Sequence, residues 1–509
     1  MTSFTASTAD PFAGRGELSP LVRASIGFLF LAAVLAIFGD FKISTFDPWT
    51  ELKRMLLGAV TPDFFATENL IRAILNTLAF AFVGVALGNL VGFLLALAFR
   101  LMFVRVICAF IRAVHELFWA LIFLQIFGLT PLTGVLAIAI PYAGIFAKVY
   151  SEILEEADQA PLKTVPAGTT ALTTFMFVRL PDAWVHFKTY SLYRLECGLR
   201  SSTVLGFVGL PTIGFHLETA FAQGEYSMAA ALLILFYLII ATIRIWVRQR
   251  LVPIYIFLAL IALPWGGEIS SENVWRFFSH DIWPQPIRIA ETLGVILWSD
   301  VAAWFTGLFA TQAWPGVINT VILTQIALVV TGMMTLVMFP LISPKFFGRT
   351  GRTIGHVALV VTRSTPEYVL ALIFLLLWGP SMLPAVVALA LHNGAIIGHL
   401  MGRYTETMTL RPDPVTPVNK YFYDVVPRIY PQFLAFLFYR WEVIMRETAI
   451  LGILGIATLG FYVDSAFADL RFDRALTLIL ITAVLNMVID TTSRAVRGRL
   501  RLKTRPEEV

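Results

Sequence analysis

An otherwise apolar stretch of the chain contains four side chains that could bind an ion: Tyr193, Arg194, Glu196 and Arg200. A charge at the centre of a lipid bilayer costs about 2.5–3.5 kcal/mol even on insertion scales, so such residues pair or line a wet path. On a helix, Tyr193, Glu196 and Arg200 share one face, whereas Arg194 points elsewhere. We interpret the set as part of a path for an anionic solute. For Glu196 and Arg200 the alternative is an ion pair that joins neighbouring helices.

The same pattern recurs 246 residues further along the chain. The repeated path residues are Tyr439, Arg440, Glu442 and Arg446. The repeat also includes glycines, which are Gly206, Gly209 and Gly214 in the first copy and Gly452, Gly455 and Gly460 in the second. Pro211 and the glycine spacing argue against a continuous helix, and broken backbone is tolerated where it lines a cavity. The glycines therefore predict a gate, with close helix packing as the alternative.

Two further acids, Glu116 and Glu367, each follow an arginine by four residues and precede an apolar run. Glu367 lies 251 residues after Glu116, so the two acids occupy equivalent positions in the repeat. One interpretation is that each begins a helix, where the helix dipole favours an acid. The other is that they are partners for Arg194 and Arg440 across neighbouring helices. Both acids belong to the predicted path.

The composition indicates an all-α polytopic membrane protein. The 509 residues are 58% hydrophobic and 14% charged, whereas an average soluble protein has about 25% charged residues. Basic residues cluster at the ends of apolar runs, so the net charge of +5 does not indicate nucleic-acid binding. No GxxxxGK(S/T) motif is present, so any driving nucleotide binds to another subunit. The histidines, His392 among them, show no ligand spacing, and we expect no metal site, no cofactor and no catalytic residues.

The apolar runs predict about twelve spans of roughly 20 residues each. They form two sets of six, in residues 1–250 and 251–509. Because six is even, the two sets are parallel repeats about an axis along the membrane normal. One side of this arrangement holds both termini and most basic clusters, which are Arg100 with Arg105, Arg244–Arg250, Lys345–Arg352 and Arg494–Arg505. That side is predicted to be cytoplasmic. It also holds two polar stretches, about 151–180 and 402–426.

The sequence resembles the permease subunits of phosphonate-type ABC importers. The first half carries the similarity in RAVHELFWALIFLQIFGLTPLTGVLA and YSLYRLECGLRSSTVLGFVGLPTIGFHL. The second half is similar more loosely, in RSTPEYVLALIF and YRWEVIMRETAILGILGIATLG. The family supplies two separate permease chains, so this sequence looks like two permeases fused into one chain.

The resemblance also implies contacts with ATPase subunits in the two polar stretches. Permeases of this kind carry a glycine thirteen residues before the proline of a Leu-Pro pair, and Gly168 and Pro181 fit that spacing. The first stretch also contains Glu155 and Glu156. The second stretch keeps Pro427 but has Pro414 in place of the glycine.

The implied function is import of a phosphorus oxyanion, such as a phosphonate or phosphite, through the bacterial inner membrane. A periplasmic solute-binding protein would deliver the solute, and two cytoplasmic ATPase subunits would bind ATP and Mg. The chain itself would not be an enzyme. An ion-coupled secondary transporter of a small anion is the alternative, since parallel six-span repeats also occur in that class. A non-transporting scaffold is disfavoured by the cost of the repeated intramembrane charges.

Overall fold

A computed structural model describes residues 19–157, 160–166, 168–267, 269–411 and 416–502. This part of the chain is helical and contains no β-strand. The helices up to residue 250 are α1 (Pro20–Ala36), α2 (Pro48–Val60), α3 (Leu70–Leu97), α4 (Met102–Ala113), α5 (Glu116–Phe127), α6 (Pro131–Glu156), α7 (Ala171–Thr174), α8 (Leu180–Val204), α9 (Ile213–Gln223) and α10 (Tyr226–Trp246).

The remaining helices are α11 (Val252–Ala262), α12 (Ser271–Arg276), α13 (Gln285–Leu293), α14 (Trp298–Leu308), α15 (Trp314–Met338), α16 (Arg349–Ser364), α17 (Glu367–Trp378), α18 (Met382–Tyr404), α19 (Pro417–Asn419), α20 (Val426–Ile450), α21 (Leu459–Ala468) and α22 (Phe472–Arg499). Short 3-10 segments, η3 (Leu205–Val208) and η9 (Leu451–Leu454), follow α8 and α20. The π-helical segments η2 (Phe175–Arg179) and η8 (Lys420–Val425) precede the same two helices.

Among the described residues, six helices are long and apolar enough to cross a membrane, and the number rises to ten if each of four bent helix pairs is one span. The bends measure 92° between α4 and α5, 93° between α16 and α17, 54° before α9 and 44° before α21. The predicted polytopic all-α class is therefore confirmed. The first and seventh predicted spans fall on two shorter apolar helices, Pro20–Ala36 and Gln249–Ala262. The total of twelve spans stays a prediction.

Close pairs of long helices form the core on each side of residue 250. Before residue 250, glycines on α3 allow α6 to pack closely against it, because a Cβ on Gly84, Gly88 or Gly92 would overlap atoms of α6. After residue 250, Gly394, Gly398 and Gly402 on α18 face Met334 and Met338 of α15 and Ile342 of the 3-10 segment η7 (Phe339–Ile342). Small residues at four-residue spacing let helices pack closely in a membrane.

The first helix of each predicted half packs on the other half. Helix α1 lies against α15, and α11 lies against α3. Helix α2 contacts both α10 and α17. The predicted boundary at residue 250 therefore does not separate two self-contained bundles, because each one is completed by a helix from the other side of the boundary.

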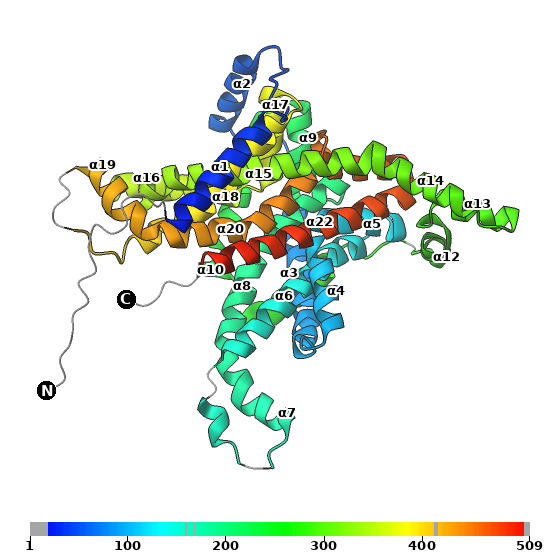
Figure 1. Cartoon of the computed structure of the whole chain (residues 1–509), viewed down its shortest axis with the longest axis horizontal. Coiled ribbons are helices and arrows are strands. Elements are labelled where there is room, and N and C mark those ends of the chain that lie inside the picture. The colour runs from blue at the N-terminus through cyan, green and yellow to red at the C-terminus, as the bar shows by residue number, and fades with distance from the viewer. Residues whose placement is uncertain (1–18, 158–159, 167, 268, 412–415, 503–509) are drawn as a thin grey trace.

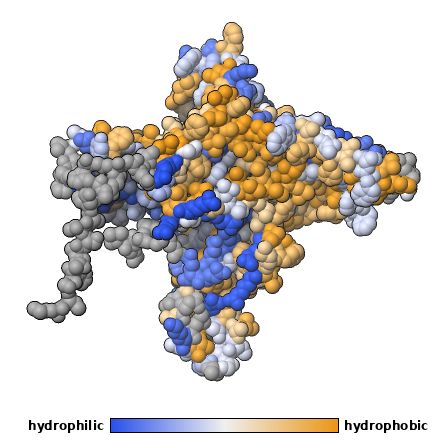
Figure 2. Space-filling model, in the orientation of Figure 1, coloured by the Kyte–Doolittle hydropathy of each residue, from blue (hydrophilic) through white to orange (hydrophobic). Residues whose placement is uncertain are grey.

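Two extremities of the molecule carry the predicted polar stretches. Figure 1 shows α7 at the end of an arm formed with α8, and α19 at another edge of the molecule. Apolar surface covers much of the face in Figure 2, while hydrophilic surface gathers in the angle between these two extremities. Exposed apolar side chains on α3 and α22, such as Leu94 and Val488, suit helices that face lipid.

Candidate functional site

Two arginines make reciprocal contacts between the two halves of the chain. Arg200 on α8 donates from Nη1 to the carbonyl oxygen of Arg363 at 3.3 Å. Arg446 on α20 donates from Nη1 to the carbonyl oxygen of Arg112 at 3.4 Å. The two acceptors lie in the last turns of α16 and α4, just before the bends. Carbonyl groups at a helix C-terminus lack intrahelical partners and carry partial negative charge, so a guanidinium stabilises each end.

The side chain of Arg112 binds two acids of the second half. Its Nε lies 3.6 Å from Oε1 of Glu442, and its Nη2 lies 3.3 Å from Oδ2 of Asp490 on α22. Glu442 therefore forms an ion pair between helices, which is the role weighed for its counterpart Glu196. Glu196 itself forms no ion pair with the residues that the structure describes. The two copies of the pattern thus differ in their contacts.

The two acids at the bends, Glu116 and Glu367, are the first residues of α5 and α17. This position agrees with the helix-dipole interpretation, and within the described residues neither acid pairs with Arg194 or Arg440. Glu116 accepts a hydrogen bond of 2.8 Å from Ser201, and its Oε2 lies 3.4 Å from Nε2 of His115. The first acid is therefore satisfied by Ser201 on α8 and by His115, which directly precedes α5.

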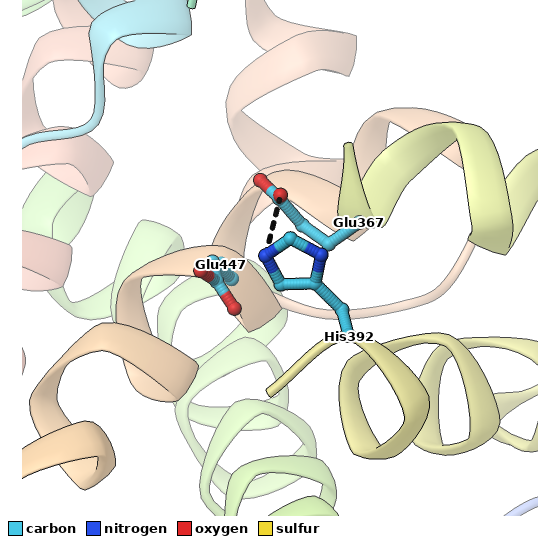
Figure 3. Close-up of side chains that lie close together, drawn as sticks. All are labelled: Glu367, His392 and Glu447. Carbon is cyan, nitrogen blue, oxygen red and sulfur yellow. Dashed lines mark ion pairs between the residues drawn. The ribbon is translucent and has the colours of Figure 1, made fainter. Parts of the chain in front are cut away.

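Around Glu367 the second half places a different set of side chains. His392 on α18 has Nε2 at 3.9 Å from Oε2 of Glu367. Glu447 on α20 accepts a 2.8 Å hydrogen bond from Asn393. Figure 3 shows Glu367, His392 and Glu447 converging from three helices. The donor atoms of these three side chains lie within 4.8 Å of one another.

Arg194 is enclosed by aromatic rings rather than by carboxylates. Its Nε donates to the hydroxyl of Tyr190 at 2.7 Å, and its guanidinium lies 5.2–5.9 Å from the ring centres of Tyr142, Tyr190 and Tyr193. Tyr193 and its counterpart Tyr439 are each 48% exposed. Such cation–π contacts hold a cation while leaving its remaining donors available.

The predicted breaks at the glycines are present in both copies. Gly209 and Gly455 have φ of 89° and 86°, which favour glycine because they are left-handed. A Cβ on Gly206 or Gly214 would overlap the backbone of the opposite side of the turn, at Phe215 and Thr203. The same overlap occurs at Gly452 and Gly460. The glycines thus make the bend possible, and their role as a gate stays a prediction.

The predicted coupling residues lie on exposed parts of the molecule. Glu155 and Glu156 are exposed at the end of α6, and Gly168 is exposed with φ of 92°. Pro181 and Pro427 are exposed in the first turns of α8 and α20. Pro414 lies outside the described residues.

Several polar residues of the site were not predicted from the sequence. They are Ser201, His392, Asn393, Glu447 and Asp490. One signal was available for Glu447, because it directly follows the repeated Arg446 in an apolar segment. The others carry polar groups common in any chain, and only the packing brings them to the bends.

The known proteins to which this chain is similar are described as permease proteins. The chain is 26% identical over 422 residues to the phosphate-import permease protein PhnE of Mycolicibacterium smegmatis, covering 78% of this chain and 77% of the relative. It is 34% identical over 188 residues to the phosphite transport system permease protein PtxC of Stutzerimonas stutzeri, covering 35% of this chain and 68% of the relative.

A third relative is the putative cryptic phosphonate transport system permease protein PhnE2 of Escherichia coli K12, with 34% identity over 23% of this chain and 95% of the relative. No family model and no solved structure matches the chain. The matches to PtxC and PhnE2 cover 68% and 95% of those proteins at 34% identity, which establishes a common family. The chain belongs to the family of ABC-type permease proteins of phosphonate and phosphite transport systems.

Proposed function

We propose that this chain is the membrane permease of an ATP-driven importer that moves a phosphorus oxyanion into the cytoplasm. Phosphate, phosphite and phosphonates, which the relatives' names include, share a tetrahedral phosphorus with anionic oxygens. The observation that carries the proposal is Arg194, whose guanidinium lies among three tyrosine rings with Nε donating to Tyr190, and whose position recurs as Arg440. A guanidinium presents several donors in a planar fork that suits such oxyanions.

The proposed path runs along α8 and α20. Its residues are Glu116, Tyr193, Arg194, Glu196, Arg200, Glu367, Tyr439, Arg440, Glu442 and Arg446. Arg194 is assigned to the solute, because tyrosines hold it and it forms no ion pair with the residues that the structure describes. Arg440 is assigned to the solute as its counterpart in the repeat. Arg200 and Arg446 are assigned to the contact between the halves. The glycine breaks Gly206, Gly209, Gly214, Gly452, Gly455 and Gly460 are assigned to the gate.

The proposed architecture consists of two fused parallel permease repeats, 1–250 and 251–509, with twelve spans. It is supported by the order of helices, because a long helix, a right-angled pair, a second long helix and a less sharply bent pair occur in both halves. Counting the two shorter apolar helices with the six long ones and the four pairs gives twelve. The proposed cytoplasmic position of both termini follows from the basic clusters.

The proposed partners are two ABC ATPase subunits, which would bind ATP and Mg, and a periplasmic solute-binding protein. The exposed segments around Gly168 and Pro427 are assigned to the ATPases. Exposed aromatic side chains support this assignment. Phe177 in η2, before α8, is 78% exposed, and Tyr423 in η8, before α20, is 77% exposed. Large exposed apolar side chains gathered in one place are typical of protein contacts.

ATP hydrolysis by the assembled transporter tests this proposal. The purified chain is combined with candidate ATPase subunits in lipid, and solute-binding proteins loaded with phosphate, phosphite, a phosphonate or an amino acid are added in turn. We expect stimulation by one or more of the phosphorus oxyanions only. Stimulation by the amino-acid-loaded protein alone would contradict the substrate class. Lack of any ATPase association, with flux driven by an ion gradient, would favour a secondary transporter.

A further inference from the structure

The cluster of Glu367, His392 and Glu447 is buried in the second half and is not needed for the reciprocal arginine contacts. The His392 side chain is 2% exposed and that of Glu367 is 14% exposed, while Glu447 as a residue is 6% exposed. One nitrogen and two carboxylate groups lie within 4.8 Å of one another. They come from α17, α18 and α20, so an ion bound between them would join three helices (Figure 3).

The hydrogen bonds of His392 fix which ring nitrogen faces the cluster. Its Nδ1 lies 2.9 Å from the carbonyl oxygen of Thr365, and a carbonyl can only accept, so Nδ1 carries the proton. Nε2 of the neutral ring then presents a lone pair. It lies 3.9 Å from Oε2 of Glu367, which is too far for a hydrogen bond. A histidine that donates one N–H to a backbone carbonyl is arranged as metal-binding histidines are.

The third group, Glu447, is also held in place by a neighbour. Asn393 donates from Nδ2 to Oε2 of Glu447 at 2.8 Å and to the carbonyl oxygen of Leu389 at 3.1 Å. Asn393 is 0% exposed, and its Oδ1 has no hydrogen-bond partner among the described residues. An unpartnered buried acceptor on the residue that holds Glu447 indicates that the site lacks a donor or a cation.

The charges of the cluster also indicate that a cation is missing from it. Within the described part of the chain, neither Glu367 nor Glu447 forms an ion pair with an arginine or lysine. Arg440, Arg446 and Arg200 act on Glu447 only from a longer distance. Two neighbouring buried carboxylates cannot both be ionised without a nearby cation, since desolvation and their mutual repulsion oppose it.

The equivalent bend in the first half, between α4 and α5, forms without a set of side chains like Glu367, His392 and Glu447. Glu116 is the counterpart of Glu367, Ser201 occupies the position of Glu447, and Pro141 occupies the position of His392. There the single acid is satisfied by the Ser201 hydroxyl at 2.8 Å and by Nε2 of His115 at 3.4 Å. An imidazole also contacts the acid of the first half, where it comes from His115, but the second carboxylate and the imidazole at position 392 occur in the second half alone.

We propose that Glu367, His392 and Glu447 bind one divalent first-row transition-metal ion, such as Zn²⁺ or Mn²⁺. An imidazole with two carboxylates suits these ions, whereas Ca²⁺ and Mg²⁺ prefer ligand sets made of oxygen alone. Donor atoms about 2.0–2.2 Å from a tetrahedral ion are roughly 3.4 Å apart. The three donor atoms lie within 4.8 Å of one another, so binding an ion requires the side chains to move closer together. The inference does not rest on the transported solute.

Metal binding by the whole chain tests this inference. The chain is purified in detergent, stripped with a chelator, dialysed and titrated with Zn²⁺ alone and with Mn²⁺ alone, with the bound metal measured by elemental analysis. We expect one ion per chain for at least one of the two metals and a thermal midpoint that rises with its concentration. Co²⁺ substitution supplies a visible spectrum that reports nitrogen and oxygen ligands directly.

The variants His392→Ala and Glu447→Ser should lose the ion, and Glu447→Ser copies the first half. Glu447→Gln keeps the volume and the contact with Asn393, so it tests the ligand if the other two variants do not fold. His216→Ala, on α9 and outside the cluster, should keep full stoichiometry. Absence of Zn²⁺ and Mn²⁺ binding by the unaltered chain overturns the inference, as does unchanged stoichiometry in all three cluster variants.

Discussion

The guanidinium of Arg446 lies 3.4 Å from the backbone carbonyl oxygen of Arg112, so a side chain of the second half caps the last turn of α4 in the first. The reverse contact, from Arg200 to Arg363, measures 3.3 Å. Both acceptors precede nearly right-angled bends. The two halves therefore hold each other at the points where their backbones turn.

Loss of one cap should weaken the fold and the contact between the halves. We expect Arg446→Met to destabilise the protein by about 1–2 kcal/mol, the range for a charged group at a helix C-terminus. Arg446→Lys, which keeps the charge, should lose less. Thermal unfolding in detergent measures both, and the exposed Arg105→Met is the matched control. A midpoint for Arg446→Met equal to that of the control would mean that the contact contributes nothing.

Arg194 and Arg440 are expected to bind the solute. Arg194→Ala should lower uptake at least tenfold at normal expression, because about 1.4 kcal/mol of lost binding corresponds to a factor of ten. Arg440→Ala should have a similar effect. Uptake of labelled phosphite by whole cells is the measurement, with Arg105→Ala as control. Normal uptake by both variants would show that these arginines are structural.

The glycine breaks make a prediction about stability that does not depend on transport. Gly214→Ala places a methyl group against the backbone of Thr203 and should cost about 1–3 kcal/mol. Gly27→Ala in α1 meets no atom within 4 Å and should stabilise the helix by up to about 1 kcal/mol. Unfolding midpoints compare the two. Equal midpoints would mean that the backbones are not in contact at the break.

Gly168 tests the coupling assignment. Its φ of 92° is unfavourable for any other residue, and its surroundings are open. Gly168→Leu should therefore alter the arm and leave ATP hydrolysis running with reduced uptake. Gly348→Leu, also at an open position but without a left-handed φ, is the control. An unchanged ratio of transported solute to hydrolysed ATP in Gly168→Leu would place the ATPase contact elsewhere.

Local sequence signals predicted the features that depend on the backbone. The breaks at Gly209 and Gly455 follow from glycines in an apolar run, and the helix starts at Glu116 and Glu367 follow from acids before such runs. Contacts between distant residues had no such signal. Arg200 binds a backbone carbonyl, a group that every residue carries.

The cluster around His392 shows the same limit for side chains. Its three residues are separated by 25 and 55 positions, from 367 to 392 and from 392 to 447, and lie on different helices. Ligand spacing can be recognised in a sequence only when the ligands share one helix or loop. The exchange of α1 and α11 between the halves was likewise decided by packing, because both are short apolar helices without a distinctive pattern.

The central claim is tested most directly by uptake into proteoliposomes. The chain is reconstituted with the proposed ATPase subunits and the proposed solute-binding protein, and entry of radiolabelled phosphite, phosphate or phosphonate is followed with ATP on the cytoplasmic side. We predict uptake that requires ATP, the ATPase and the binding protein together. Equal uptake by the chain alone under an ion gradient would contradict the account.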